Sequence, residues 1–400
     1  MKALRSSTDL AALGAPPMFP EPLLVGRPNI GNKERLFTYL SEILERRWLT
    51  NHGVLVQEFE RRLAQYLGVK HAIPICNGTV ALELAIRALD LTGEVIVPSF
   101  TFIATAHALH WQGLRPVFAD VDPNTHTLDP AAVEAAITPR TTGILGVHLW
   151  GRACDTEALA AIARRHNLRL LFDAAHAFGC SHGGTMIGNF GDCEVFSFHA
   201  TKFFNTSEGG AICTNDDSLA AKLRLMKNFG FQGYDNVVYV GTNGKMPEIC
   251  AAMGLTNLEE IEDFLAANRR NLRAYEDGLR GIEGLTLARM PSEARSNCQY
   301  VVVEIDADRF GLSRDVVYRL LHDEQVIARR YFHPGCHRME PYRTLDPDAG
   351  RRLPETERLA GRVLCFPTGT QTSPEQIAQI CALLRFLQEN ARDIRGRVAA

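Results

Sequence analysis

The chain has 400 residues, of which 46% are hydrophobic and 22% are charged, and its formal net charge is −3. This balance gives no reason to expect nucleic acid or an anionic membrane surface as a partner, and no apolar run is long enough to span a bilayer. Because such a length exceeds what one hydrophobic core usually organises, we expect two domains.

The first thirty residues contain five prolines and show little periodicity, so we expect residues 1–30 to form an extended arm. Lys2 and Arg5 are followed by Asp9 without an adequate apolar segment, which argues against a secretory signal and for a cytoplasmic protein. The ten cysteines lack C-x-x-C spacing, and most of them lie in apolar contexts. They are interpreted as reduced core thiols.

Amphipathic patterns predict two helices, over residues 32–48 and 55–67, and Gly68 ends the second. Short apolar strands then alternate with helices. Strands are predicted at 72–76, 94–97, 116–119, 143–149, 169–172 and 194–198, and helices at 80–89, 103–111, 130–137 and 155–166. Continuous Val/Ile/Leu/Phe runs are typical of strands buried on both faces, so we predict an α/β fold with a mostly parallel sheet flanked by helices.

The pattern changes after residue 210. A helix is predicted at 218–227, followed by an irregular glycine-rich stretch (230–244) and a long helical region (247–279). The remaining elements are expected at 300–305 (strand), 313–324 (helix), 326–328 (strand) and 374–388 (helix). We therefore predict a large domain over residues 31–255 and a smaller α+β domain over residues 256–400.

Lys202 follows the strand predicted at 194–198 and has apolar neighbours, with Ser197 close by. Burying an ammonium without a partner is costly. A lysine in such a place is either neutralised or used covalently, and Schiff-base chemistry with a carbonyl achieves both. The alternative is a lysine whose stem packs while its head reaches water.

Two other strand ends carry polar residues, and ligands of such sheets bind beyond these ends. Asn77-Gly78-Thr79 precedes an apolar helix and is either a phosphate seat, with Gly78 admitting the backbone, or an ordinary N-cap. Asp173 follows the strand at 169–172 and needs a cationic partner. No H-E-x-x-H and no second carboxylate stand at ligand spacing, so no metal is expected.

A lysine, an anion seat and a carboxylate together suit pyridoxal 5′-phosphate, whose pyridine nitrogen would be the cation beside Asp173. The cofactor ring also needs a flat side chain above it. Phe102 is a candidate, although aromatic residues at such positions are more often part of the core.

Four motifs occur in order at these strand ends: N-G-T-x-A-L, P-S-F-T-F-I-A-T, D-A-A-H-A-F-G and S-F-H-A-T-K, the last followed by E-G-G. With them, the chain from about residue 25 to 369 resembles the DegT/DnrJ/EryC1/StrS aminotransferases. The resemblance implies the aspartate aminotransferase-like fold of pyridoxal phosphate enzymes (fold type I) and a reaction that aminates keto-sugars bound to nucleotides.

The resemblance also implies residue roles at the cofactor. Lys202 would be the Schiff-base lysine, Asp173 the partner of the pyridine nitrogen, and His176 a neighbour of the ring hydroxyl; these are the expected catalytic residues. Asn243 would reach the phosphate of the neighbouring subunit, which implies a homodimer with shared active sites. The full expected cofactor set is Gly78, Thr79, Val80 (through its backbone), Phe102, Asp173, His176, Ser197, Lys202 and Asn243.

The segment 328–342 has two interpretations. His333, Cys336 and His337 could be metal ligands, but a fourth ligand is missing. The segment is also similar to the family's loop over the active site, where a histidine matching His337 touches the sugar. Tyr331 and Arg329 are further substrate candidates for the nucleotide phosphates or the donor carboxylate, although solvated arginines are the commoner case.

The resemblance implies a ping-pong transamination with L-glutamate as donor, on a dTDP-4-keto-6-deoxyhexose that becomes the 4-amino-4,6-dideoxyhexose. Amination at C3 and GDP- or UDP-linked sugars remain open. Relatives that carry histidine in place of the lysine are dehydratases, so Lys202 favours transamination. An NAD-dependent nucleotide-sugar dehydrogenase or epimerase is disfavoured, because no G-x-G-x-x-G follows an early strand.

Overall fold

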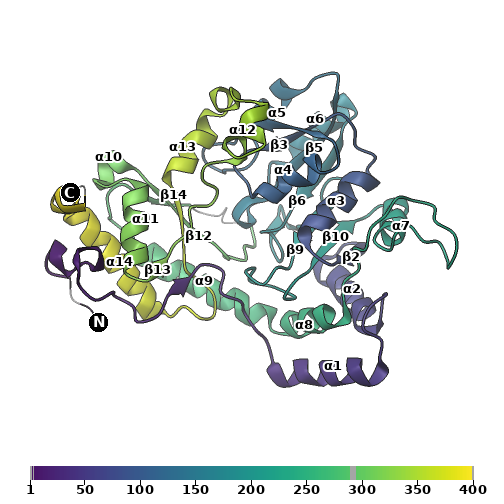
Figure 1. Cartoon of the computed structure of the whole chain (residues 1–400), viewed down its shortest axis with the longest axis horizontal. Coiled ribbons are helices and arrows are strands. Elements are labelled where there is room, and N and C mark those ends of the chain that lie inside the picture. Colours follow the sequence, from purple (N-terminus) through teal and green to yellow (C-terminus); the bar gives the residue numbers. More distant parts are fainter. Residues whose placement is uncertain (1, 3, 289–293, 399–400) are drawn as a thin grey trace.

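The computed structural model describes residues 2, 4–288 and 294–398, and a seven-stranded sheet is its largest element (Figure 1). The strands are ordered β2-β10-β9-β6-β5-β3-β4 across the sheet. β10 is antiparallel to β2 and β9, and the other neighbouring pairs are parallel, which confirms the predicted mostly parallel sheet. The strands are β2 (His71–Ile75), β3 (Glu94–Pro98), β4 (Arg115–Ala119), β5 (Thr141–Val147), β6 (Arg169–Asp173), β9 (Cys193–Ser197) and β10 (Gly210–Thr214).

Helices cover both faces of this sheet. Successive residues of a strand point to opposite faces, so neighbouring residues pack in different cores. Val195 of β9 belongs to a core shared with α3, α4 and α7, whereas the next residue, Phe196, belongs to a core shared with α2 and α8. Further along the sheet, α5 and α6 pack on β5 and β6. The helices are α2 (Val54–Leu67), α3 (Gly78–Ala88), α4 (Ile103–His110), α5 (Pro130–Ala136), α6 (Thr156–His166), α7 (Asp217–Met226) and α8 (Glu248–Glu259).

A smaller antiparallel sheet, ordered β11-β12-β14, forms a second unit with its own core of Tyr275, Val303, Leu384 and their neighbours. The elements built on this core are α9 (Ile261–Gly278), β11 (Leu285–Leu287), β12 (Val301–Ile305), α10 (Ala307–Phe310), α11 (Arg314–Asp323), β13 (Val326–Ile327), β14 (Val363–Phe366), α14 (Pro374–Glu389) and α15 (Ala391–Val398). Between β13 and β14 the chain forms α12 (Tyr342–Leu345) and α13 (Pro354–Arg362), whose buried residues Tyr342 and Leu359 belong to the core of the large sheet. The domain boundary expected between residues 255 and 256 falls inside α8 and stays a prediction.

The N-terminal arm packs on this smaller unit. Leu10, Phe19 and Leu23 are buried in its core, and β1 (Leu23–Leu24) pairs in parallel with β13. Beyond the arm, α1 (Lys33–Arg46) packs along α8 at the bottom of Figure 1. Apolar side chains spaced along the arm therefore attach it to the second sheet.

Two predicted elements differ from the structure. The strand expected at 143–149 ends at Val147, and Leu149–Gly151 forms a 3₁₀ turn in which Trp150 has φ +62°. The helical region at 247–279 is two helices, interrupted at Glu260 with φ −103° and ψ 8°. In both places the apolar residues continue past the end of the element because they line another buried surface, so hydrophobicity alone did not reveal the break.

None of the helices in the described part of the chain combines the length and the apolar character needed to cross a bilayer. All ten cysteines are free, and most of them are buried, which agrees with the prediction of reduced core thiols.

Candidate active site

A cleft of about 590 Å³ opens beyond the carboxyl ends of the parallel strands. Parallel strands end at the same edge of a sheet, so residues that follow β2, β3, β6 and β9 converge there. The predicted site residues that line this cleft are Gly78, Thr79, Val80, Phe102, Asp173, His176, Ser197, Lys202, Arg329 and Tyr331. The expectation that these distant segments meet is thereby confirmed, whereas their roles stay predictions.

The start of α3 forms an anion seat at one end of the cleft. Asn77 is the N-cap, and its side-chain oxygen accepts a hydrogen bond from the Val80 N–H at 2.8 Å. A Cβ on Gly78 would lie 2.9 Å from Cβ of Ser197, so only glycine allows this close approach of helix and strand. The N–H groups of the first turn and the helix dipole favour a negatively charged group here.

Asp173, at the end of β6, is buried and forms no ion pair within the described residues. The Thr105 hydroxyl donates to its Oδ2 at 2.9 Å, and the Ala175 N–H donates to its Oδ1 at 3.0 Å. Burial raises the pKa of Asp173, while these donors and the charge of Lys202 oppose the rise. A buried carboxylate held by neutral donors is ready for a cation in the cleft.

Thr105 was not among the residues predicted for the site. Its hydroxyl, in the first turn of α4, lies 3.1 Å from the hydroxyl of Thr101, which precedes the helix. The signal was its place at the end of P-S-F-T-F-I-A-T, because residues that follow a strand of a parallel sheet face the ligand crevice.

Lys202 projects into the cleft from the turn after β9, where its N–H donates to the His199 carbonyl at 2.9 Å. Burial lowers the pKa of Lys202 to about 8, and the negative charge of Asp173 opposes part of this shift. Its Nζ makes no hydrogen bond or ion pair with the described chain. The amine is therefore partly neutral, and so nucleophilic, near neutral pH.

His176 lies in a stack of aromatic rings on the wall of the cleft. Its ring is 5.9 Å from Trp150 and 5.8 Å from Phe332, with interplanar angles of 20° and 15°. Tyr300 Oη lies 3.4 Å from its Nε2. Burial, with a smaller contribution from the Lys202 charge, holds the pKa of His176 well below its usual range, so the ring is neutral.

Two predicted site residues lie outside the cleft lining. Asn243 is exposed, and its backbone forms an isolated antiparallel β-bridge with Asn228. His337 is buried, with Nδ1 2.7 Å from Ser99 Oγ and Nε2 2.7 Å from a Glu357 carboxylate oxygen. Because both of its nitrogens are engaged, we propose no sugar contact for His337. Within the described ranges, no group of three His, Cys, Asp or Glu side chains is placed to hold a metal ion.

The cleft fits a phosphorylated pyridine aldehyde. The glycine at the start of α3 leaves room for an anion beside Ser197, the lysine can bond to a carbonyl carbon, and the buried carboxylate can face a protonated ring nitrogen. Lys202 and Asp173 are close enough for the charge of each to shift the pKa of the other. These features correspond to the three requirements of pyridoxal phosphate.

Comparisons with known proteins agree with this chemistry. The sequence profile of the DegT/DnrJ/EryC1/StrS aminotransferase family matches residues 31–385. A dTDP-4-amino-4,6-dideoxy-D-glucose transaminase of Shigella dysenteriae is 38% identical over 92% of this chain and 100% of its own length. A GDP-perosamine synthase of Caulobacter vibrioides is 40% identical over 81% of this chain and 88% of its own.

Among solved structures, that of DesI in the presence of its TDP-sugar product is similar over 99% of this chain and 100% of its own, with 48% identity and a TM-score of 0.94.

Proposed function

Because this chain belongs to the DegT/DnrJ/EryC1/StrS family of pyridoxal phosphate-dependent aminotransferases, we propose that it aminates C4 of a dTDP-linked 4-keto-6-deoxyhexose. L-Glutamate is the proposed amino donor. The observation that carries the substrate is the similarity to DesI, solved with its TDP-sugar product, over nearly the whole of both chains. The relative from Shigella dysenteriae is also a dTDP-sugar transaminase.

Lys202 and Asp173 carry the chemistry in this proposal. The bound cofactor supplies an aldehyde carbon that accepts the amino group and a ring that spreads carbanion charge. Lys202 Nζ would hold the cofactor covalently until the donor replaces it. The freed amine would then take the proton from the α-carbon of glutamate as a general base and deliver it, as a general acid, to the former aldehyde carbon of the cofactor. Asp173 would hold the proton on the pyridine nitrogen.

Other residues would position the reactants. Thr79 and Ser197, with the first turn of α3, would bind the phosphate, and Phe102 would cover the ring. Arg329 lines the same cleft, with its guanidinium carbon 5.7 Å from the centre of the Tyr331 ring. The Arg329 backbone is fixed by two hydrogen bonds: its N–H donates to the Cys365 carbonyl at 3.0 Å, and its carbonyl accepts from the Cys365 N–H at 2.8 Å. Because its guanidinium lines the cleft, we propose Arg329 for an anionic group of the substrate.

The test is transfer of nitrogen from labelled glutamate to purified sugars. The enzyme is supplied with dTDP-, UDP- and GDP-linked 4-keto-6-deoxyhexoses and with a 3-keto isomer, and the product is located by nitrogen-coupled NMR. We expect the highest kcat/KM with the dTDP sugar and nitrogen at C4. The similarity to a GDP-perosamine synthase makes the GDP sugar the alternative substrate. A higher kcat/KM with the GDP sugar, or nitrogen at C3, would overturn the proposed substrate.

A homodimer with shared active sites is also proposed. Large apolar side chains are exposed on α1 (Phe37, 67%; Leu44, 65%) and in the segment after α7 (Tyr234, 97%; Val240, 77%). Exposed apolar surface of this kind is typical of interfaces. Asn243 belongs to the same segment, which supports its predicted reach into the neighbouring site.

Mixing two inactive variants tests this arrangement. Lys202→Ala and Asn243→Ala subunits, allowed to exchange, should regain activity, because each hybrid contains one site with an intact lysine and asparagine. Random exchange in equal amounts predicts about a quarter of the wild-type activity. Failure of the mixture to exceed the separate variants, although hybrids are seen by native mass spectrometry, would mean that Asn243 serves its own subunit or none.

The lowered pKa of Lys202 predicts how fast the cofactor-free protein takes up pyridoxal phosphate. At pH 8 about half of Lys202 should be neutral, against about 0.3% of an ordinary lysine. The uptake rate, followed by the change in visible absorbance, should rise with pH and level off just above pH 8. A rate that keeps rising about tenfold per pH unit up to pH 10 would show an ordinary lysine.

A further inference from the structure

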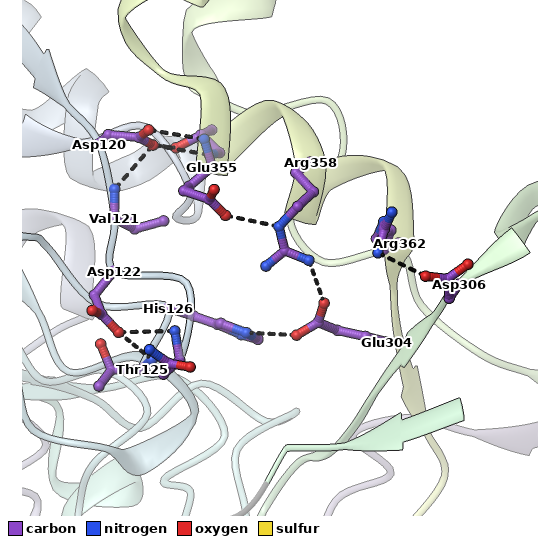
Figure 2. Close-up of polar contacts among 12 residues, drawn as sticks. Asp120, Val121, Asp122, Thr125, His126, Glu304, Asp306, Glu355, Arg358 and Arg362 are labelled. Atoms are coloured by element: carbon purple, nitrogen blue, oxygen red, sulfur yellow. Dashed lines mark hydrogen bonds and ion pairs between the residues drawn. The ribbon is translucent and has the colours of Figure 1, made fainter. Parts of the chain in front are cut away.

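A chain of polar contacts joins the large sheet to the smaller one at the loop that follows β4 (Figure 2). In this loop, His126 is buried, and its Nε2 lies 3.0 Å from Oε1 of Glu304 on β12. The other Glu304 oxygen accepts a hydrogen bond from Arg358 of α13 at 2.8 Å. The loop is therefore bonded to β12 of the smaller sheet and, through Glu304, to α13.

The same loop holds α13 at a second point. Asp120 accepts hydrogen bonds from the backbone N–H groups of Glu355 and Thr356, both at 2.9 Å, and from the Thr356 hydroxyl at 2.8 Å. Its carboxylate thus caps the N-terminus of α13, as Figure 2 shows. Two independent contacts fix the position of β12 and α13 relative to the loop.

His126 also contacts Trp150, whose indole N–H donates to its Nδ1 at 3.3 Å. The indole nitrogen can only donate, so Nδ1 must be an unprotonated acceptor and Nε2 must carry the proton that is donated to Glu304. His126 therefore uses both nitrogens: Nδ1 accepts from Trp150, which follows β5 of the large sheet, and Nε2 donates to Glu304 on β12 of the smaller sheet. A side chain without a donor and an acceptor cannot make this bridge.

Trp150 is buried behind the cleft wall, against His176 and Phe332, which line the cleft. Its ring stacks on His176 and on Phe332, and its backbone N–H points to Nδ1 of His176 at 3.4 Å. Both Trp150 and His126 have φ +62°, a backbone region that costs non-glycine residues energy and is kept only where the surroundings enforce it.

From these contacts we propose that His126 is a positioning residue. It holds the Trp150 indole flat beside His176 and ties that indole, through Glu304, to the smaller sheet. The orientation of His176 toward the cofactor thus depends on a contact between the two units. This inference rests on the proposed function insofar as His176 faces the cofactor ring.

The experiment compares His126→Phe, which keeps a ring but loses both nitrogens, with His126→Gln, whose amide can accept from Trp150 and donate to Glu304. Arg362→Gln is the matched control, because it removes a contact between α13 and Asp306 (3.3 Å) that does not lead to Trp150. Trp48 and Trp111, which are exposed, are replaced by phenylalanine so that fluorescence reports Trp150 alone.

The first readout is acrylamide quenching of Trp150 in the cofactor-free protein, and the second is the dissociation constant of pyridoxal phosphate. His126→Phe should make Trp150 more accessible and weaken cofactor binding by about tenfold or more. His126→Gln should restore both values toward wild type, and Arg362→Gln should change neither. Because quenching needs no cofactor, it separates failure of this inference from failure of the proposed function.

The proposal is overturned if Trp150 in His126→Phe is as protected as in Arg362→Gln, or if His126→Gln is as impaired as His126→Phe. Should His126→Phe not fold, the bridge can be cut from the other side. Glu304→Met removes the acceptor, whereas Glu304→Gln keeps an oxygen for the Nε2–H. The methionine variant should expose Trp150 and the glutamine variant should protect it, and equal quenching of the two would overturn the proposal.

Discussion

Replacing Lys202 by alanine is expected to abolish both the visible absorbance of covalently held cofactor and amino transfer, while the protein stays folded. The side chain is buried in the cleft and its amine has no hydrogen-bond partner in the described chain, so no part of the fold depends on its charge. Loss of a general base alone slows a reaction by about a hundred- to ten-thousandfold. Activity is measured as nitrogen transfer, and folding by circular dichroism.

Lys227 offers a matched control for this experiment. Burial also lowers its pKa to about 8, but it lies outside the cleft lining, 3.9 Å from Glu60. Borohydride reduction followed by peptide mass spectrometry should find the cofactor on Lys202 in the wild type and in Lys227→Met. Retention of the visible band in Lys202→Ala, or a label on Lys227, would remove Lys202 from its assigned role.

Asp173→Asn is expected to slow turnover by at least about a hundredfold with little change in the fold. In the proposed function, the partner of Asp173 is the protonated pyridine nitrogen of the cofactor. Removing one member of such a buried charge pair typically costs about 3–5 kcal/mol. Each 1.4 kcal/mol or so of this cost that appears in the barrier slows the reaction about tenfold. Asparagine keeps the size of the side chain and an oxygen for the Ala175 N–H. The measurement is single-turnover transfer from glutamate.

The stability of the cofactor-free variant separates a role in catalysis from a role in folding. Because burial raises the pKa of Asp173 in the folded chain, its ionised form opposes folding as the pH rises through the ordinary range of aspartate. Asp173→Asn should therefore not lower Tm at pH 7. Asp192→Asn, which weakens a 2.8 Å contact to the Leu170 N–H at the opposite end of β6, should lower Tm without slowing turnover. Near-wild-type rates in Asp173→Asn would contradict its role.

Much of this site could be predicted from the sequence because its signals are local. Apolar runs predicted the strands to within a few residues, and ligands of such sheets bind at the strand ends, so the residues after each strand were candidates. A lysine among apolar residues and a glycine before a helix also need no knowledge of distant contacts. Those residues meet in one cleft, as expected.

Other features depend on contacts between residues far apart in the chain, and only the tertiary structure decided them. Thr105 donates to Asp173, 68 residues away, and His337 is bonded to Ser99, 238 residues away. His126 joins Trp150 to Glu304, which lies 178 residues after His126 in the chain. A polar side chain in a loop has the same local pattern whether it faces the substrate or another buried polar group. The sequence by itself therefore determined the fold class and the chemistry that the strand ends supply, and the packing of the two sheets decided which polar residues reach the cleft and which hold it in shape.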